Sequence, residues 1–173
     1  MIGILEARKL MAESLVDMAG DIAVICEEDA SRVSNFVNEF AEIACEMMPQ
    51  DVDHVIYFKH FADGLTDGFS LEYVVEEEVD RDQAGALVES GMVDKISQEH
   101  RFKAACYILD MEDLGEFPDN YGQEGKIAAA TAYTDGYSIG RDRYSYLETH
   151  FGEPAMYVDS RAVKSALMKI TQE

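Results

Sequence analysis

The sequence contains no tryptophan, only three prolines and only three cysteines among its 173 residues. Cys26, Cys45 and Cys106 are odd in number and lack a C-x-x-C spacing, which excludes a disulfide framework and a zinc knuckle. No apolar run is long enough to span a bilayer, and the first residues do not form a charged region leading into an apolar block. We therefore expect reduced core cysteines and a cytoplasmic protein that does not bind membranes.

Basic residues are also scarce. The chain has 14 Lys and Arg against 35 Asp and Glu, which gives a formal net charge of −21 and a pI near 4.3. A protein that binds nucleic acid by neutralising phosphates needs the opposite sign of charge, so we expect no direct nucleic-acid binding. The hydrophobic content of 47% is too high for a disordered chain, and the length suits one ordinary domain or two very small ones.

The negative charge is distributed unevenly. The first 120 residues hold 28 acidic and 8 basic residues, whereas residues 121–173 hold 7 and 6, together with six of the nine tyrosines. A stretch rich in turn-forming residues, 113–125, separates the two parts. We therefore predict an acidic helical lobe over residues 1–120 and a near-neutral lobe rich in Tyr and Arg over 121–173, with one single domain as the alternative.

The spacing of the apolar residues predicts helices. Apolar residues recur at intervals of three and four in stretches close to 4–18, 29–47, 95–111 and 159–170. Residues 51–79 fit a buried strand as well as a helix, and the helical period is the better fit. The predicted fold class is mainly α: a compact helical domain with a tyrosine-rich C-terminal portion and room for one short β hairpin.

One short segment occurs twice. The sequence TDGFSL at 66–71 returns as TDGYSI at 134–139, with four identities. An Asp-Gly pair is typical of a turn, because glycine tolerates positive φ and Asp bonds nearby backbone. An ancient duplication and two similar turns are both compatible with the echo, and the lack of similarity in the flanking residues favours two turns.

The motifs for metals and phosphates are incomplete. A calcium loop starting at Asp80 fails because Ala84 and Gly91 stand where oxygen ligands belong. His60 and Asp63 are spaced to share a helix face, but a metal ion would need further ligands from elsewhere. We therefore expect no metal and no cofactor, and we assign no catalytic residue.

The segment 133–152 has the most distinctive composition, with four tyrosines, several glycines and two arginines. Tyr and Arg are enriched at binding hot spots because they offer large amphipathic area. The plainer interpretation is that the tyrosines are half-buried and that the arginines pair with acidic residues, and it is the more common case. A third alternative is an enzyme that holds an anionic small molecule with Arg141, Arg143, Tyr146 and His150.

The acidic residues suggest a function. Carboxylates three or four apart on a helix lie roughly 5–6 Å from each other, a spacing that can imitate the phosphates of nucleic acid. We therefore expect a small binding or inhibitory protein, a DNA mimic of the kind that phages carry, which engages the basic surface of a nucleic-acid-processing protein. Solubility, salt adaptation, pairing with a partner subunit and self-association remain alternatives, and the pattern favours a binding protein over an enzyme. The residues expected to bind the partner are Glu39, Glu42, Glu46, Glu76, Glu77, Glu78, Asp80, Asp82, Tyr137, Arg141, Arg143 and Tyr144.

Overall fold

The structure, a computed structural model, describes residues 2–19, 30–70, 79–151 and 160–173. This part of the chain is 81% helical and contains seven α-helices and no strand. The prediction of a mainly α fold is confirmed, and the described ranges contain no β hairpin. No helix in these ranges combines the length and the apolar character needed to cross a membrane.

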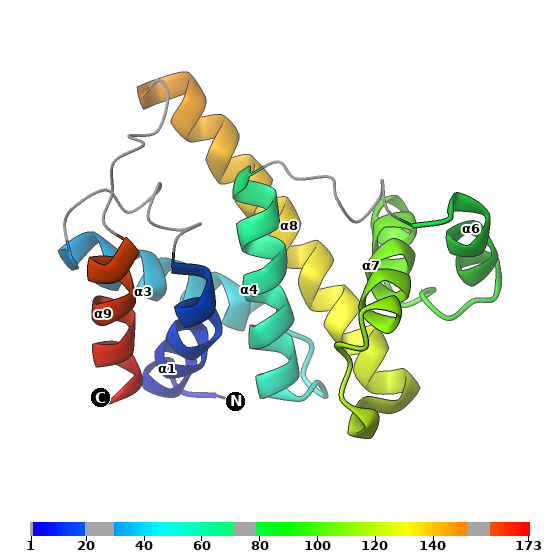
Figure 1. Cartoon of the computed structure of the whole chain (residues 1–173), viewed down its shortest axis with the longest axis horizontal. Helices are drawn as coiled ribbons and strands as arrows, with labels where there is room; N and C mark the ends of the chain where they lie inside the picture. The colour runs from blue at the N-terminus through cyan, green and yellow to red at the C-terminus, as the bar shows by residue number, and fades with distance from the viewer. Residues whose placement is uncertain (1, 20–29, 71–78, 152–159) are drawn as a thin grey trace.

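Four helices enclose the first hydrophobic core on one side of the molecule (Figure 1). Its buried apolar residues come from successive turns of each helix, as the three-and-four spacing predicted. Phe36, Phe40 and Phe69 pack against one another at its centre, with ring centroids 4.6–5.8 Å apart. The helices are α1 (Ile4–Leu15, continued by the 3-10 turn Val16–Met18), α3 (Ala30–Met47), α4 (His54–Ser70) and α9 (Ser160–Thr171).

Three further helices build a second core on the other side of α4 (Figure 1). Small residues of α7 and α8, such as Ala104 and Ala130, allow these helices to approach, and Tyr107 stacks on Tyr133 with ring centroids 3.9 Å apart. These helices are α6 (Arg81–Glu89), α7 (Arg101–Asp113, preceded by the 3-10 turn Gln98–His100) and α8 (Gly122–Phe151, preceded by the 3-10 turn Asp119–Tyr121).

The parallel pair α4 and α8 joins the two cores. Four glycines line the crossing: a Cβ atom on Gly64 would overlap the carbonyl oxygen of Tyr133, and one on Gly136 would overlap that of Phe61. Gly68 and Gly140, one turn further along each helix, meet the opposite backbone in the same reciprocal way. The glycines are therefore required by the close approach of two main chains, not by turns.

This arrangement corrects two expectations. Both TDG segments lie inside helices, α4 and α8, so the interpretation as two similar turns is wrong. Residues 133–151 continue one helix, where the sequence suggested a segment loosened by its glycines. Local propensity misled in both cases, because glycine disfavours an isolated helix but permits close packing against a neighbour.

The predicted helices otherwise correspond to described ones. The stretches near 4–18, 29–47, 95–111 and 159–170 match α1, α3, α7 and α9, and the ambiguous stretch 51–79 is helical over His54–Ser70. The expected helix caps Asp29 and Asp159 lie outside the described residues. The division of the chain at residue 120 stays a prediction.

Candidate functional site

One face of α3 presents three glutamates to solvent. Glu39, Glu42 and Glu46 are all exposed, and spacings of three and four place them on the same side of the helix. The opposite side of α3 is fixed in the first core by residues such as Val37 and Phe40. The three carboxylates therefore form a row whose positions are set by a rigid element. We call Glu39, Glu42 and Glu46 the α3 row.

One described cation lies close to this row. Arg143 Nη1 of α8 is 3.7 Å from Glu39 Oε1, and both side chains are partly exposed. Among the described residues, no Lys or Arg nitrogen lies within 4.0 Å of the carboxylates of Glu42 or Glu46. A pair exposed to this degree is weak, so most of the charge of the α3 row is directed to solvent.

The charge of the row acts on the neighbouring thiol. Burial, followed by the negative charges of Glu42 and Glu46, raises the pKa of Cys45 above the ordinary range of a thiol. A thiol of this kind stays protonated and is a weak nucleophile. Cys45 is therefore part of the helix packing and not a reactive centre.

The acidic residues of the second core do not join the α3 row. Asp80 and Asp82 are exposed at the start of α6, which lies at the far end of the molecule from α3 (Figure 1). The Asp80 side chain accepts hydrogen bonds from the backbone N–H groups of Asp82 and Gln83, so it caps the helix. The remaining carboxylates of the predicted set, Glu76, Glu77 and Glu78, lie outside the described residues.

The predicted Tyr and Arg contacts are dispersed. Tyr137 is 2% exposed in the second core, with Lys103 Nζ 4.0 Å from the centre of its ring, so it is not a surface contact. Arg141 is exposed next to Asp142, and Arg143 faces the α3 row. The side chain of Tyr144 lies outside the described residues. Of this group, the structure places only Arg143 beside the predicted acidic residues.

The alternative enzyme site is not assembled by the described residues. Arg141 and Arg143 are two positions apart on an uninterrupted helix, so their side chains leave it about 200° apart. Tyr146 and His150 have side chains outside the described residues. The two guanidinium groups therefore do not converge on one anion.

A second arrangement resembles a catalytic triad only in composition. Ser138 Oγ lies 3.5 Å from His100 Nε2, and Glu99 Oε1 lies 3.2 Å from the same nitrogen. A triad needs its carboxylate on the other ring nitrogen, where it orients the imidazole and stabilises its charge. This contact is therefore not an activated nucleophile.

The most ordered polar cluster lies between α4, α7 and the start of α8. His60 is fully buried, with its Nδ1 atom 2.5 Å from Tyr107 Oη and its Nε2 atom 3.0 Å from Tyr121 Oη. Tyr107 donates its hydroxyl proton to Asp63 Oδ2 over 3.1 Å. These four residues form one continuous hydrogen-bond chain, which we call the His60 chain. The sequence analysis missed it because nothing in the spacing of Tyr107 and Tyr121 shows that their hydroxyl groups meet one imidazole.

Burial shifts the two ionisable ends of this cluster in opposite directions. Desolvation, with a smaller effect of the Lys59 charge, lowers the pKa of His60 to about 4. Desolvation raises the pKa of Asp63 to about 6, against the opposing effects of the Tyr107 hydrogen bond and Lys59. At neutral pH the ring is neutral and the carboxylate is charged. The order of the two pKa values is the reverse of the ordinary one.

The described residues hold no group of three or more His, Cys, Asp and Glu arranged to bind a metal ion. His60 and Asp63 do lie together, with Nδ1 3.7 Å from Oδ2, as their spacing suggested. Both ring nitrogens of His60 are already engaged by tyrosine hydroxyl groups. The pair is therefore used in hydrogen bonding and not in metal binding.

The surface near the His60 chain has two open hollows on either side of Lys126, with volumes of about 550 and 370 Å³. The smaller one is lined in part by Phe117, whose ring also contacts His60 with centroids 6.0 Å apart. Neither hollow contains the convergent polar groups of a small-molecule site. Comparisons of the chain with protein-family models, curated proteins and solved structures found no match.

Proposed function

We propose that this chain is a small acidic binding protein that inhibits a nucleic-acid-processing protein by covering its basic surface. The observation that carries the proposal is the α3 row: three exposed carboxylates on one face of a helix whose other face is fixed in a core. A rigid set of charges loses little conformational freedom on binding, so the attraction to a cationic partner is not offset by ordering the side chains' backbone.

The spacing and net charge support mimicry of nucleic acid. Neighbouring carboxylates on the row are roughly 5–6 Å apart, which is comparable with the distances between phosphates along a strand. The net charge of −21 adds a long-range field that speeds the encounter with a basic groove. The proposed setting is the cytoplasm.

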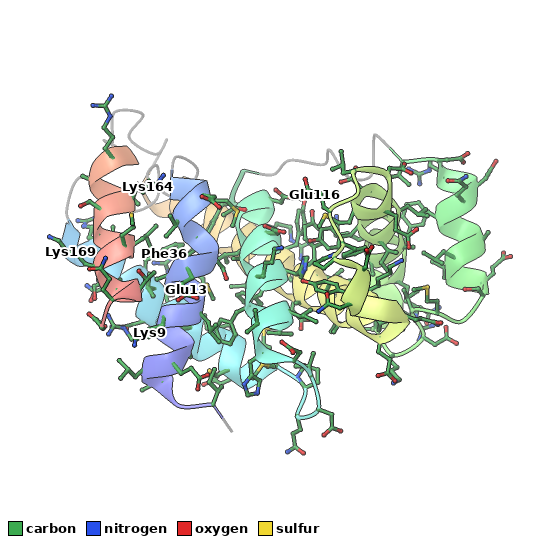
Figure 2. All side chains as sticks on the ribbon, turned by 60° about the horizontal axis from the view of Figure 1, so that its bottom comes forward. Lys9, Glu13, Phe36, Glu116, Lys164 and Lys169 are labelled. Carbon is green, nitrogen blue, oxygen red and sulfur yellow. The ribbon has the colours of Figure 1, made fainter. Side chains whose placement is uncertain are left out.

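The cationic residues of the chain leave the row accessible. Lys9, Lys164 and Lys169 lie on α1 and α9 (Figure 2), and within the described residues none of them forms an ion pair with the α3 row. Glu116 lies on the other side of α4 in the same view. The charged groups are therefore distributed so that α3 offers a region of one sign, and Arg143 is the described residue that limits it.

The first experiment is affinity capture from the source cell with three baits. One bait is the wild-type chain, one carries Gln at Glu39, Glu42 and Glu46, and the matched control carries Gln at the exposed residues Glu13, Glu89 and Glu124. Both variants change the net charge by the same amount, so only the position of the charges differs. Captured proteins are identified by mass and challenged with duplex DNA and with salt.

The proposal predicts that the wild type and the control capture a nucleic-acid-binding protein that duplex DNA displaces, and that the α3-row variant captures much less of it. Capture that is equal for all three baits would refute the role of the row. Capture of a protein that duplex DNA does not displace would refute mimicry of nucleic acid.

A further inference from the structure

The His60 chain has a direction that its geometry determines. Tyr107 has one hydroxyl proton, and it donates this proton to Asp63. His60 Nδ1 must therefore carry the proton in its bond to Tyr107, because the tyrosine oxygen has none left to donate. Nε2 is then the acceptor of the Tyr121 hydroxyl. With Asp63 ionised, every donor in the chain has one acceptor.

We propose that protonation of Asp63 reverses this chain and exchanges the tautomer of His60, so that the cluster is a proton-coupled switch linking α4, α7 and the start of α8. In the reversed chain the Asp63 carboxyl group donates to Tyr107, Tyr107 donates to Nδ1, and Nε2–H donates to Tyr121. The oxygen and nitrogen positions can stay where they are, because each hydrogen bond keeps its two heavy atoms and exchanges its donor.

The proton balance is simple. Tyr121 passes its hydroxyl proton to Nε2, Nδ1 passes its proton to Tyr107, and Tyr107 passes its proton to Asp63. A proton from solvent restores the Tyr121 hydroxyl group, so the cluster gains one proton in total. Both ends can exchange with water, since Asp63 has a side-chain exposure of 33% and Tyr121 is partly exposed, whereas His60 is fully buried.

The surroundings favour a proton on Asp63 over a second proton on the ring. A charged imidazolium at His60 would be enclosed by the rings of Tyr107, Tyr121 and Phe117, with no water to solvate it. The other charged groups that act on this cluster are Lys59 and Asp67 on α4, Asp53 before α4, and Glu116 after α7. Glu116 disfavours an anionic Asp63, and Lys59 disfavours a cationic His60.

The consequence is a link between acidity and the start of α8. Tyr121 is the last residue of the 3-10 turn that leads into α8. In one state its hydroxyl is held as a donor to a buried nitrogen, and in the other it accepts from that nitrogen and is free to donate to water. Mild acid therefore changes how this turn is hydrogen-bonded without adding charge to the core.

The test is nitrogen NMR of the imidazole rings in the intact chain, from about pH 8 down to about pH 5, which distinguishes protonated from unprotonated ring nitrogens. The His60 signals are assigned by their loss in His60→Gln. The wild type should show protonated Nδ1 at the upper end and protonated Nε2 at the lower end, with a midpoint near the Asp63 pKa of about 6.

Two variants test the cause of the exchange. Asp63→Asn should keep Nδ1 protonated throughout the range, because the amide cannot gain a proton there and its oxygen still accepts from Tyr107. Asp135→Asn is the matched control, since Asp135 also accepts from a tyrosine hydroxyl but contacts no buried histidine in that bond, and it should leave the exchange unchanged.

Three results would overturn the proposal. The first is a single His60 tautomer in the wild type over the whole range. The second is protonation of both ring nitrogens with one midpoint near pH 6, which would place the added proton on His60 and not on Asp63. The third is an exchange that persists in Asp63→Asn. The wild-type measurement is decisive even where a variant fails to fold.

Discussion

Gly64 of α4 faces the main-chain carbonyl group of Tyr133 of α8 so closely that no methyl group fits between the two helices. The relationship is reciprocal, because Gly136 of α8 faces the carbonyl group of Phe61 in the same way. This crossing joins the two hydrophobic cores. It also positions the tyrosines and aspartates that bond across it, so the polar clusters depend on it.

Gly64→Ala should destabilise the chain. Alanine normally stabilises a helix interior by about 1 kcal/mol relative to glycine, but here the added methyl group must push two backbones apart. We expect the free energy of unfolding to fall by about 2 kcal/mol, within the range of overpacked cores. Urea unfolding followed by circular dichroism measures it.

Gly85 is the internal control for that substitution. It lies inside α6, and a Cβ atom placed there meets nothing within 4 Å. Gly85→Ala should therefore raise the free energy of unfolding by about 0.5–1 kcal/mol. If both substitutions stabilise the chain, the two helices do not cross as closely as described.

Tyr57→Phe should shift the titration of Asp135. The Tyr57 hydroxyl group donates to Asp135 Oδ2 over 2.8 Å, and this bond lowers a pKa that burial has raised. Its removal leaves the desolvated carboxylate without that donor, so the pKa of Asp135 should rise further. Carboxyl carbon NMR over a pH series measures the shift, and an unchanged or lower pKa would contradict the hydrogen bond.

Asp63→Asn and His60→Gln should have opposite pH dependence. The pKa of Asp63 is raised to about 6, so its contribution to stability is fully present below the unfolded pKa of 3.8 and is lost as the pH rises through about 6. The pKa of His60 is lowered to about 4, so its contribution is present above 6.5 and is lost as the pH falls through about 4.

The loss of stability caused by Asp63→Asn should therefore be larger at about pH 4.5 than at about pH 7, and the loss caused by His60→Gln should be smaller. Urea unfolding of the wild type and each variant at both pH values gives the comparison. Equal losses at the two pH values would show that the groups do not titrate as their burial implies.

Helical periodicity predicted the first core well. The stripe in residues 29–47 and the closing helix near 159–170 have apolar faces that become α3 and α9. The start of α8 was harder, because Gly122 and Gly125 look like turn residues and residues 133–152 contain several glycines. Their helical conformation depends on α4, which is distant in sequence, so local propensity could not reveal it.

The two candidate sites differ in the same way. The α3 row could be recognised from spacing alone, since one amphipathic helix determines which residues face solvent. The His60 chain combines residues from α4, α7 and the turn before α8, and no short motif links them. A useful signal is a tyrosine on an otherwise apolar helix face, such as Tyr107, because its buried hydroxyl group needs a partner.

Arg143→Gln should strengthen binding to a cationic partner. Arg143 lies 3.7 Å from Glu39, so its removal leaves the α3 row more negative. The association rate constant at low salt should rise by a small factor, while the dissociation rate constant changes less, because surface charges act mainly on encounter. A slower association would mean that Arg143 contacts the partner itself.

The most direct test of the account is the association rate constant of the captured partner with two triple variants over a range of salt concentrations. Replacing Glu39, Glu42 and Glu46 by Gln should slow association and flatten its salt dependence, whereas the same change at Glu13, Glu89 and Glu124 should have a much smaller effect. If the two variants associate at the same rate, the α3 row is not the surface that the partner binds, and the proposed function is contradicted.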